Sequence, residues 1–137
     1  MSENQYLSLR DKISAEKIER QERYVEYERI LNAAYEKGLE AGRNIMPTPM
    51  VVSGGGTSYY VPEGVCGFAW VHIRRANAGF GKWLLHTKRG RRGYPSGVDI
   101  WVSEFNQSHA RKYAAAQVIA DELRQRGIDA SARERLD

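Results

Sequence analysis

The sequence has few of the residues from which metal, redox and acid–base sites are built. It holds one cysteine, Cys66, which can form no disulfide within the chain and no zinc site by itself. Asp99 and Glu104 would lie on opposite faces if the strand predicted around Asp99 continued that far, and they make a poor carboxylate pair for acid–base work. We therefore expect no metal, no cofactor and no catalytic group, and we predict that the chain is not an enzyme. Its three histidines fall in different predicted elements without metal-ligand spacing: His72, His86 and His109.

Long apolar runs are also absent. No stretch approaches the roughly 18 apolar residues that a membrane-spanning helix needs. Residues 1–10 are polar and lack the apolar segment of a signal peptide. We therefore expect a cytoplasmic chain with no membrane partner. Its 137 residues fit one domain, and a chain of this size buries only about two-thirds of its surface alone, so a second subunit would help to stabilise it.

Acidic residues are missing from one long segment. Between Glu63 and Asp99 there is none, although the chain as a whole carries a net charge of only +4. The rest of the chain is therefore net negative, and the positive field is confined to this segment. Such a field favours a phosphate-bearing partner, with a solvated basic loop as the alternative. The segment holds seven bases: Arg74, Arg75, Lys82, Lys88, Arg89, Arg91 and Arg92.

Helical periodicity dominates the first third of the chain. Apolar and small residues recur at three-and-four spacing from Tyr24 to Gly42, with Glu and Lys or Arg around the other faces. The pattern predicts one helix over residues 14–42, about 44 Å long at about 1.5 Å per residue. Because this exceeds the width of a small domain, we interpret it as a protruding oligomerisation helix. A kink or break is the alternative, and its tyrosines are interpreted as core or interface residues.

Residues 47–137 are predicted to form an α+β unit that carries the ligand site. Pro47 and Pro49 end the long helix, because the residue before a proline is pushed out of the helical region. His72 falls in an apolar segment typical of a central strand, and we interpret it as a hydrogen-bonded core residue rather than a base. The further elements are predicted as a hairpin over 50–61, a strand over 66–73, a helix over 80–88, a loop over 88–97, a strand over 98–103, a helix from Ser108 to about Arg126, and a last strand through Ile128, Ala130 and Ala132.

The predicted fold class is therefore α+β. It has a long N-terminal helix followed by a small, mainly antiparallel sheet flanked by helices, in one domain over residues 1–137.

Binding has better support in the sequence than catalysis. The bases of residues 88–92 include arginines, whose planar fork grips phosphate. Asn106 falls at a strand-to-helix junction, where free backbone N–H groups attract anions; helix capping is an equal and compatible interpretation. Aromatic side chains that can stack on a base lie near in sequence: Phe80, Trp83, Tyr94 and Trp101.

Several segments resemble a phage family, the first-described Thoeris anti-defence proteins. The similar segments are YEKGLEAGRNIMPTPMVV at 35–52, CGFAWV at 66–71, FGKWL at 80–84 and VDIWVSEFNQS at 98–108. Members of that family bind the cyclic ADP-ribose isomers made by Thoeris TIR-domain proteins without cleaving them. They also form oligomers, including hexamers that hold cyclic di- or trinucleotides at separate sites. The resemblance implies a phage sponge that withholds the signal from the defence effector, as a hexamer built from dimers.

The resemblance also implies ligand-binding residues. The family's aromatic residue before the strand, its asparagine near the strand's end and its arginine late in the last helix are matched by Tyr94, Asn106 and Arg124. Loop lengths differ, so Ser96 or Gly97 is an alternative to Tyr94. Two residues of the neighbouring loop are expected to line the same pocket: Pro49 and Met50.

A second ligand site and two alternative functions are also considered. If a cyclic-oligonucleotide site exists, the symmetry of an oligomer would bring together Arg20 and Arg23 from several copies. The alternative function is a small phage nucleic-acid-binding protein, whose basic loop and Tyr94 would contact backbone and bases. An enzyme that degrades a nucleotide signal is the third hypothesis.

Overall fold

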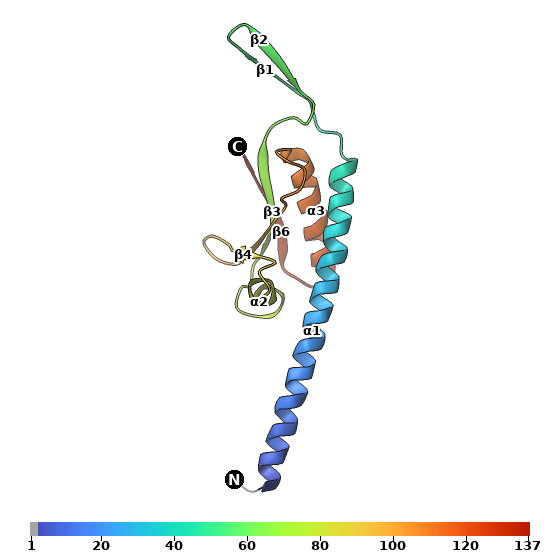
Figure 1. Ribbon diagram of the computed structural model, residues 1–137, viewed down its shortest axis with the longest axis vertical. Coiled ribbons are helices and arrows are strands. Elements are labelled where there is room, and N and C mark those ends of the chain that lie inside the picture. The colour runs from blue at the N-terminus through green and yellow to red at the C-terminus, as the bar shows by residue number, and fades with distance from the viewer. Residues whose placement is uncertain (1–2) are drawn as a thin grey trace.

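The computed structural model describes residues 3–137 and confirms the predicted α+β class (Figure 1). A long N-terminal helix is followed by antiparallel strands and two further helices. The described elements are α1 (Glu3–Asn44), β1 (Met50–Gly54), β2 (Thr57–Val61), β3 (Gly67–Ile73), α2 (Gly79–His86), β4 (Arg91–Arg92), β5 (Val98–Trp101), α3 (His109–Gln125) and β6 (Ala130–Leu136).

Four strands form one antiparallel sheet in the order β4-β5-β3-β6. The central position of β3 agrees with the prediction from its apolar sequence. Alternate residues of β3, beginning with Ala69 and Val71, are fully buried under α3. Figure 1 shows α3 between the sheet and α1, so one face of the sheet is covered and the other points away from both helices.

Small residues allow α1 and α3 to pack closely. Gly38 of α1 lies where a Cβ atom would come 2.5 Å from Ile119 and 2.8 Å from the carbonyl oxygen of Ala115. Ala115, Ala116 and Ala120 of α3 are fully buried in the same core. Close approach of two helices brings Leu31 and Ala34 of α1 into the core as well, and burial of each large apolar side chain stabilises the fold by roughly 1.5–3 kcal/mol.

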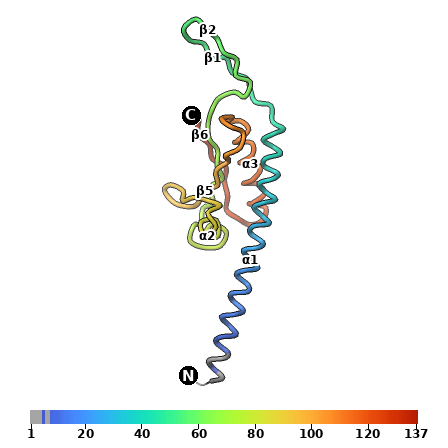
Figure 2. The backbone as a smooth tube through the Cα atoms, in the orientation of Figure 1, coloured from blue at the N-terminus to red at the C-terminus, as the bar shows by residue number. Residues whose placement is uncertain are grey.

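Helix α1 is longer than its sequence pattern predicts. It begins by Glu3 rather than residue 14, and its 42 residues extend about 63 Å without a break, so the alternative of a broken helix is wrong. The carboxyl half belongs to the core, and the half-buried Tyr24, Tyr27 and Tyr35 pack against it as predicted. The amino half projects beyond the sheet and exposes Leu9 among other apolar side chains (Figure 2).

Strands β1 and β2 form a separate two-stranded hairpin. The hairpin predicted over residues 50–61 is confirmed, but it does not join the main sheet. It projects from the end of the molecule opposite the amino half of α1 (Figure 2). Four large side chains on its two strands are exposed: Val51, Val52, Tyr59 and Tyr60.

Two strand predictions need correction. The loop predicted over residues 88–97 contains β4, whose Arg91 and Arg92 pair with β5. The last strand begins at Ala130 rather than Ile128 and continues to Leu136. Both errors have the same cause: arginine-rich segments at a sheet edge show little apolar alternation, which is the signal from which strands are predicted.

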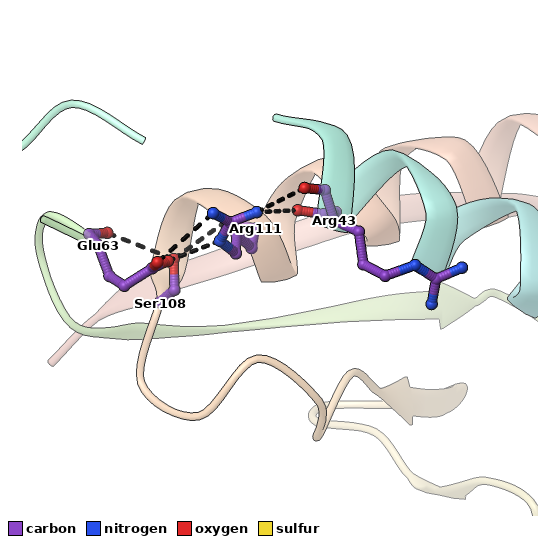
Figure 3. A network of polar contacts seen from close by, with 5 residues as sticks. Arg43, Glu63, Ser108 and Arg111 are labelled. Carbon is purple, nitrogen blue, oxygen red and sulfur yellow. Dashed lines mark hydrogen bonds and ion pairs between the residues drawn. The ribbon is translucent and has the colours of Figure 1, made fainter. Parts of the chain in front are cut away.

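Arg111 ties together the end of α1, the start of α3 and the segment after the hairpin (Figure 3). Its guanidinium donates to the carbonyl oxygens of Gly42 and Arg43 at 2.9 and 2.8 Å, which caps the carboxyl end of α1. Its Nε donates to Oε2 of Glu63 at 2.6 Å. Its backbone N–H donates to Oγ of Ser108, the N-cap residue of α3. One side chain of α3 therefore joins the end of α1 to the segment that follows the hairpin.

The Glu63–Arg111 pair makes stability depend weakly on pH. The hydrogen bond from Arg111 lowers the pKa of Glu63 below its ordinary value. A carboxyl group whose pKa is lower in the folded state stabilises the fold above its unfolded pKa, and this contribution is lost as the pH falls through the folded pKa. We expect Glu63→Gln to lower the Tm slightly at pH 7 and the difference from the wild type to shrink as the pH falls toward 3, measured by thermal unfolding across that range. An equal difference at both pH values would contradict this account.

Candidate functional site

The implied ligand residues Pro49 and Met50 lie in the segment that leaves α1 and enters the hairpin. Pro49 is exposed, and Met50 is the half-buried first residue of β1. They are therefore at the end of the molecule from which the hairpin projects (Figure 1).

Asn106 and Arg124 lie at opposite ends of α3. Asn106 is exposed in the loop before the helix and has a left-handed backbone, with φ of 52°. Arg124 is in the last turn, where its guanidinium donates to the carbonyl oxygen of Ala130 at 2.9 Å. The 17 residues of α3 put about 25 Å between the two ends. One copy of the chain therefore does not gather these two residues around one small ligand.

Arg124 also lines a shallow groove along α1 and α3. Ala41 and Asn44 of α1, with Ile45 directly after the helix, form one side of it. The guanidinium of Arg124 lies 3.6 Å from the carboxylate of Asp121 on the same helix. Its hydrogen bond to Ala130 also ties the end of α3 to the start of β6, so it stabilises the fold as well as lining this groove.

Tyr94 lies in the loop between β4 and β5, and its side chain is 92% exposed. The peptide bond between Tyr94 and Pro95 is cis. Pro95 and Ser96 line a cavity beside His72. No hydrogen bond or ion pair of residues 3–137 joins any two of the five implied ligand residues.

Arg20 and Arg23 are exposed on the projecting half of α1. They lie three residues apart, so they occupy neighbouring positions on one helix. The seven bases of the acid-free segment are also dispersed rather than gathered in one loop. Arg89, for example, donates to Asn32 of α1 at 2.8 Å and lies 6.0 Å from the ring of Trp83.

The face of the main sheet that points away from α3 carries a more compact set of polar and aromatic side chains. Residues paired directly across antiparallel strands share a face, so the register arranges this outer face in rows. One row is Arg91–Asp99–His72–Ser131, the next is Trp101–Trp70–Arg133, and the third is Phe68–Arg135. We call this set the outer face.

Three aromatic rings lie together in the middle of the outer face. Trp70 and Trp101 stack with ring centroids 4.5 Å apart and an angle of 27° between their planes. Phe68 meets Trp101 edge-on at 6.3 Å. All three rings are half-buried, so part of their surface stays open to solvent. The sheet therefore holds an aromatic surface on a rigid frame, as sites that stack on nucleobases do.

Arginines of β6 border this aromatic surface. The guanidinium carbon of Arg135 lies 5.0 Å from the ring centroid of Phe68. Arg133 is exposed directly across from Trp70 and forms no ion pair with any of residues 3–137. An unpaired arginine beside stacked tryptophans suits a phosphate next to a base.

A buried histidine–aspartate pair lies in the neighbouring row. Nδ1 of His72 and Oδ1 of Asp99 are 2.7 Å apart, and the two residues are only 7% and 9% exposed. The interpretation of His72 as a hydrogen-bonded core residue is confirmed. His72 also lines a cavity of about 420 Å³, whose other walls are Arg74, Pro95, Ser96, Asp129, Ser131 and Arg133.

Glycines of the β4–β5 loop allow this pair to be covered. A Cβ atom on Gly97 would lie 2.5 Å from Cε1 of His72 and 2.5 Å from the carbonyl oxygen of Ile73. Gly97 also has φ of 83°, which favours glycine. A Cβ atom on Gly93 would lie 2.9 Å from Oδ1 of Asp99. The loop that carries Tyr94 therefore folds directly onto the histidine–aspartate pair.

Within residues 3–137, no group of three His, Cys, Asp or Glu side chains is placed to hold a metal ion. The described histidines occupy different elements, as predicted: His72 lies in β3, His86 ends α2 and His109 begins α3. None of the helices in this part of the chain is both long enough and apolar enough to cross a membrane.

Sequence reasoning named Trp101 as a stacking candidate but missed the partners that the register gives it. The alternation in Phe68, Trp70 and His72 is visible in the sequence, since these residues occupy every second position of one predicted strand. Arg133 and Arg135 alternate in the same way near the end of the chain. The sequence therefore indicated one strand with ring side chains at every second position and another with arginines at every second position.

Comparisons of the chain with family models, curated proteins and solved structures find no match.

Proposed function

We propose that the chain is a phage anti-defence sponge, which binds a cyclic ADP-ribose-type signal and withholds it without cleaving it. The observation that carries the proposal is the stacked pair Trp70 and Trp101 beside the unpaired Arg133 on the outer face. The adenine stacks on the aromatic surface, and the arginine binds the pyrophosphate. The resemblance of the sequence to Thoeris anti-defence proteins names this class of ligand.

The expected energies are sufficient for a binding protein. Stacking of one base on aromatic side chains contributes about 1–3 kcal/mol. A charge-assisted hydrogen bond between arginine and phosphate contributes about 1.5–3 kcal/mol. A tight sponge needs more than one such contact of each kind. We assign the rest of the binding free energy to the residues implied by the resemblance, which further copies of the chain would bring to the ligand.

Self-association is part of the proposal because one copy separates the implied residues. Asn106 and Arg124 lie at opposite ends of α3, so a pocket that contains both needs two copies. The hairpin exposes Val51 and Tyr60, and an isolated two-stranded hairpin is marginally stable in water. Contact with a second copy would stabilise it.

The proposed assembly is a hexamer built from dimers, acting in the cytoplasm of an infected bacterium. In that assembly Pro49 and Met50 of one copy complete the pocket with Tyr94, Asn106 and Arg124. Arg20 and Arg23 on the projecting half of α1 would meet their equivalents and hold a cyclic di- or trinucleotide. No catalytic step is proposed, and the ligand is released chemically unchanged.

The second candidate is a nucleic-acid-binding protein. It is favoured by the same outer face, where Arg91, Arg133 and Arg135 border the aromatic rings on both sides. Aromatic side chains with flanking bases bind single strands with little sequence preference. The two candidates differ in the expected dependence on salt, because a strand of many phosphates releases many counterions and a small cyclic ligand releases few.

Calorimetric titration with cyclic ADP-ribose isomers and with a 20-nucleotide single strand, each at 50 and 200 mM salt, separates the two. We expect saturable binding of an isomer that weakens less than tenfold between these salt concentrations. Arg133→Ala should weaken it about tenfold or more, as loss of a charge-assisted hydrogen bond predicts. Arg29→Ala, on the exposed side of α1, is the matched control. Affinity for the strand alone, falling steeply with salt, would favour the second candidate instead.

A further inference from the structure

We infer that the His72–Asp99 pair recognises a ribose hydroxyl, so that the outer face selects ribonucleotides over deoxyribonucleotides. The inference rests on the proposed function, since it assigns the sugar of the nucleotide whose base and phosphate that function places here. It makes His72 a specificity-determining residue.

The first step is the direction of the hydrogen bonds. A carboxylate only accepts, so Nδ1 of His72 donates its proton to Oδ1 of Asp99 across 2.7 Å. In the neutral imidazole the other nitrogen then carries a lone pair and no proton. Nε2 is therefore a hydrogen-bond acceptor. The partner that satisfies it must be a donor, and a hydroxyl group is one.

The second step is the surroundings of Nε2. His72 lines the cavity of about 420 Å³, a volume within the range of small-molecule pockets. No group of residues 3–137 donates to Nε2, although Ser96 and Ser131 also line the cavity. The backbone of Gly97 packs against one side of the ring, because a Cβ atom added there would lie 2.7 Å from Nε2, so the ring is open on the side that lines the cavity. The acceptor is thus available to a molecule in the cavity.

The third step is the position of the cavity relative to the base and the phosphate. His72 and Trp70 share one face of β3 and are separated by two residues, about 7 Å along the strand. Arg133 lies across from Trp70 and also lines the cavity. A nucleotide whose base stacks on Trp70 therefore has His72 within reach of its sugar and Arg133 within reach of its phosphate.

The charges around the cavity agree with this placement. Arg74, directly after β3, is paired with Asp129 at 3.7 Å, and the carboxylate of Asp99 on β5 is paired with His72. Arg133 on β6 remains as the cation without an acidic partner. A hydrogen-bond acceptor beside an unpaired arginine suits a hydroxyl beside a phosphate.

The experiment compares ADP with 2′-deoxy-ADP and 3′-deoxy-ADP by calorimetric titration of the full chain. A buried acceptor left without its donor is costly, so we expect at least one deoxy analogue to bind about tenfold more weakly or worse. His72→Phe is the key variant, because a phenyl ring of similar size has no nitrogen that could bond the hydroxyl in either direction. That variant should bind ADP and the analogue about equally. Asp129→Asn, which lines the same cavity without touching His72, should keep the preference.

The outcomes are distinguishable. Equal binding of ADP and both analogues by the wild type would overturn this inference and leave the proposed function standing. Binding of a cyclic ADP-ribose isomer without binding of ADP would overturn this inference alone, and failure of the wild type to bind either would overturn both. If His72→Phe does not fold, ¹⁵N chemical shifts of the His72 ring in the wild type replace it. The Nε2 signal should move on addition of ADP and not on addition of the weaker analogue. An unmoved Nε2 signal at saturating ADP would contradict the inference.

Discussion

Trp70→Ala is expected to weaken the binding of a cyclic ADP-ribose isomer by about 5- to 150-fold, because stacking on one base contributes about 1–3 kcal/mol. The variant removes the ring that stacks on Trp101 at 4.5 Å and leaves Arg133 in place. The measurement is the Kd from calorimetric titration.

Loss of folding must be separated from loss of binding in this variant. Trp70→Phe is the matched control, because it keeps an aromatic ring and should retain most of the affinity. Circular dichroism and the Tm of both variants show whether the sheet persists. A folded Trp70→Ala variant with wild-type affinity would remove the outer face from the account.

Gly38→Ala is expected to destabilise the chain, although alanine favours an isolated helix over glycine by about 1 kcal/mol. The added Cβ would lie 2.5 Å from Cγ1 of Ile119 and 2.8 Å from the backbone oxygen of Ala115. Because a backbone atom cannot move aside as a flexible side chain can, α1 and α3 must separate. Overpacking of this kind costs about 1–3 kcal/mol, which exceeds the gain in helix propensity.

The change is measured as the free energy of unfolding in urea. Gly54→Ala is the control, since nothing lies within 4 Å of its added Cβ and its stability should be nearly unchanged. A Gly38→Ala variant more stable than the wild type would mean that α1 does not pack on α3 as described.

The sequence predicted the elements of the fold well where their apolar pattern is strong. The long periodic run from Tyr24 to Gly42 identified α1, and Ser108 was correctly placed as the cap of α3. The start of α1 was missed because residues 3–13 show no sustained apolar period. A helix stabilised by local propensity alone lacks the apolar periodicity from which helices are predicted. Arg91 and Arg92 were assigned to a loop for the same reason.

The candidate site was harder to predict because it depends on register. His72 and Asp99 are 27 residues apart, and only the pairing of β3 with β5 places them opposite each other. The same pairing brings Trp70 to Trp101, and the pairing with β6 adds Arg133. Alternation in one strand indicates which side chains share a face, but it does not indicate which strand lies beside it.

The residues implied by the resemblance could not be tested by the fold of one copy, because they lie far apart in it. Asn106 and Arg124 lie about 25 Å apart along α3 of one copy. Their roles depend on an assembly, and contacts between copies are not encoded in the periodicity of one chain. The outer face, by contrast, is complete within one copy.

The most direct measurement of the central claim is native mass spectrometry of the chain mixed with cyclic ADP-ribose isomers, followed by heat release and mass analysis of the ligand. The account predicts an oligomer that carries ligand, and a released ligand with the mass and chromatographic retention of the one added. A released product of altered mass would make the chain an enzyme, and a ligand-free protein at saturating isomer would contradict the sponge.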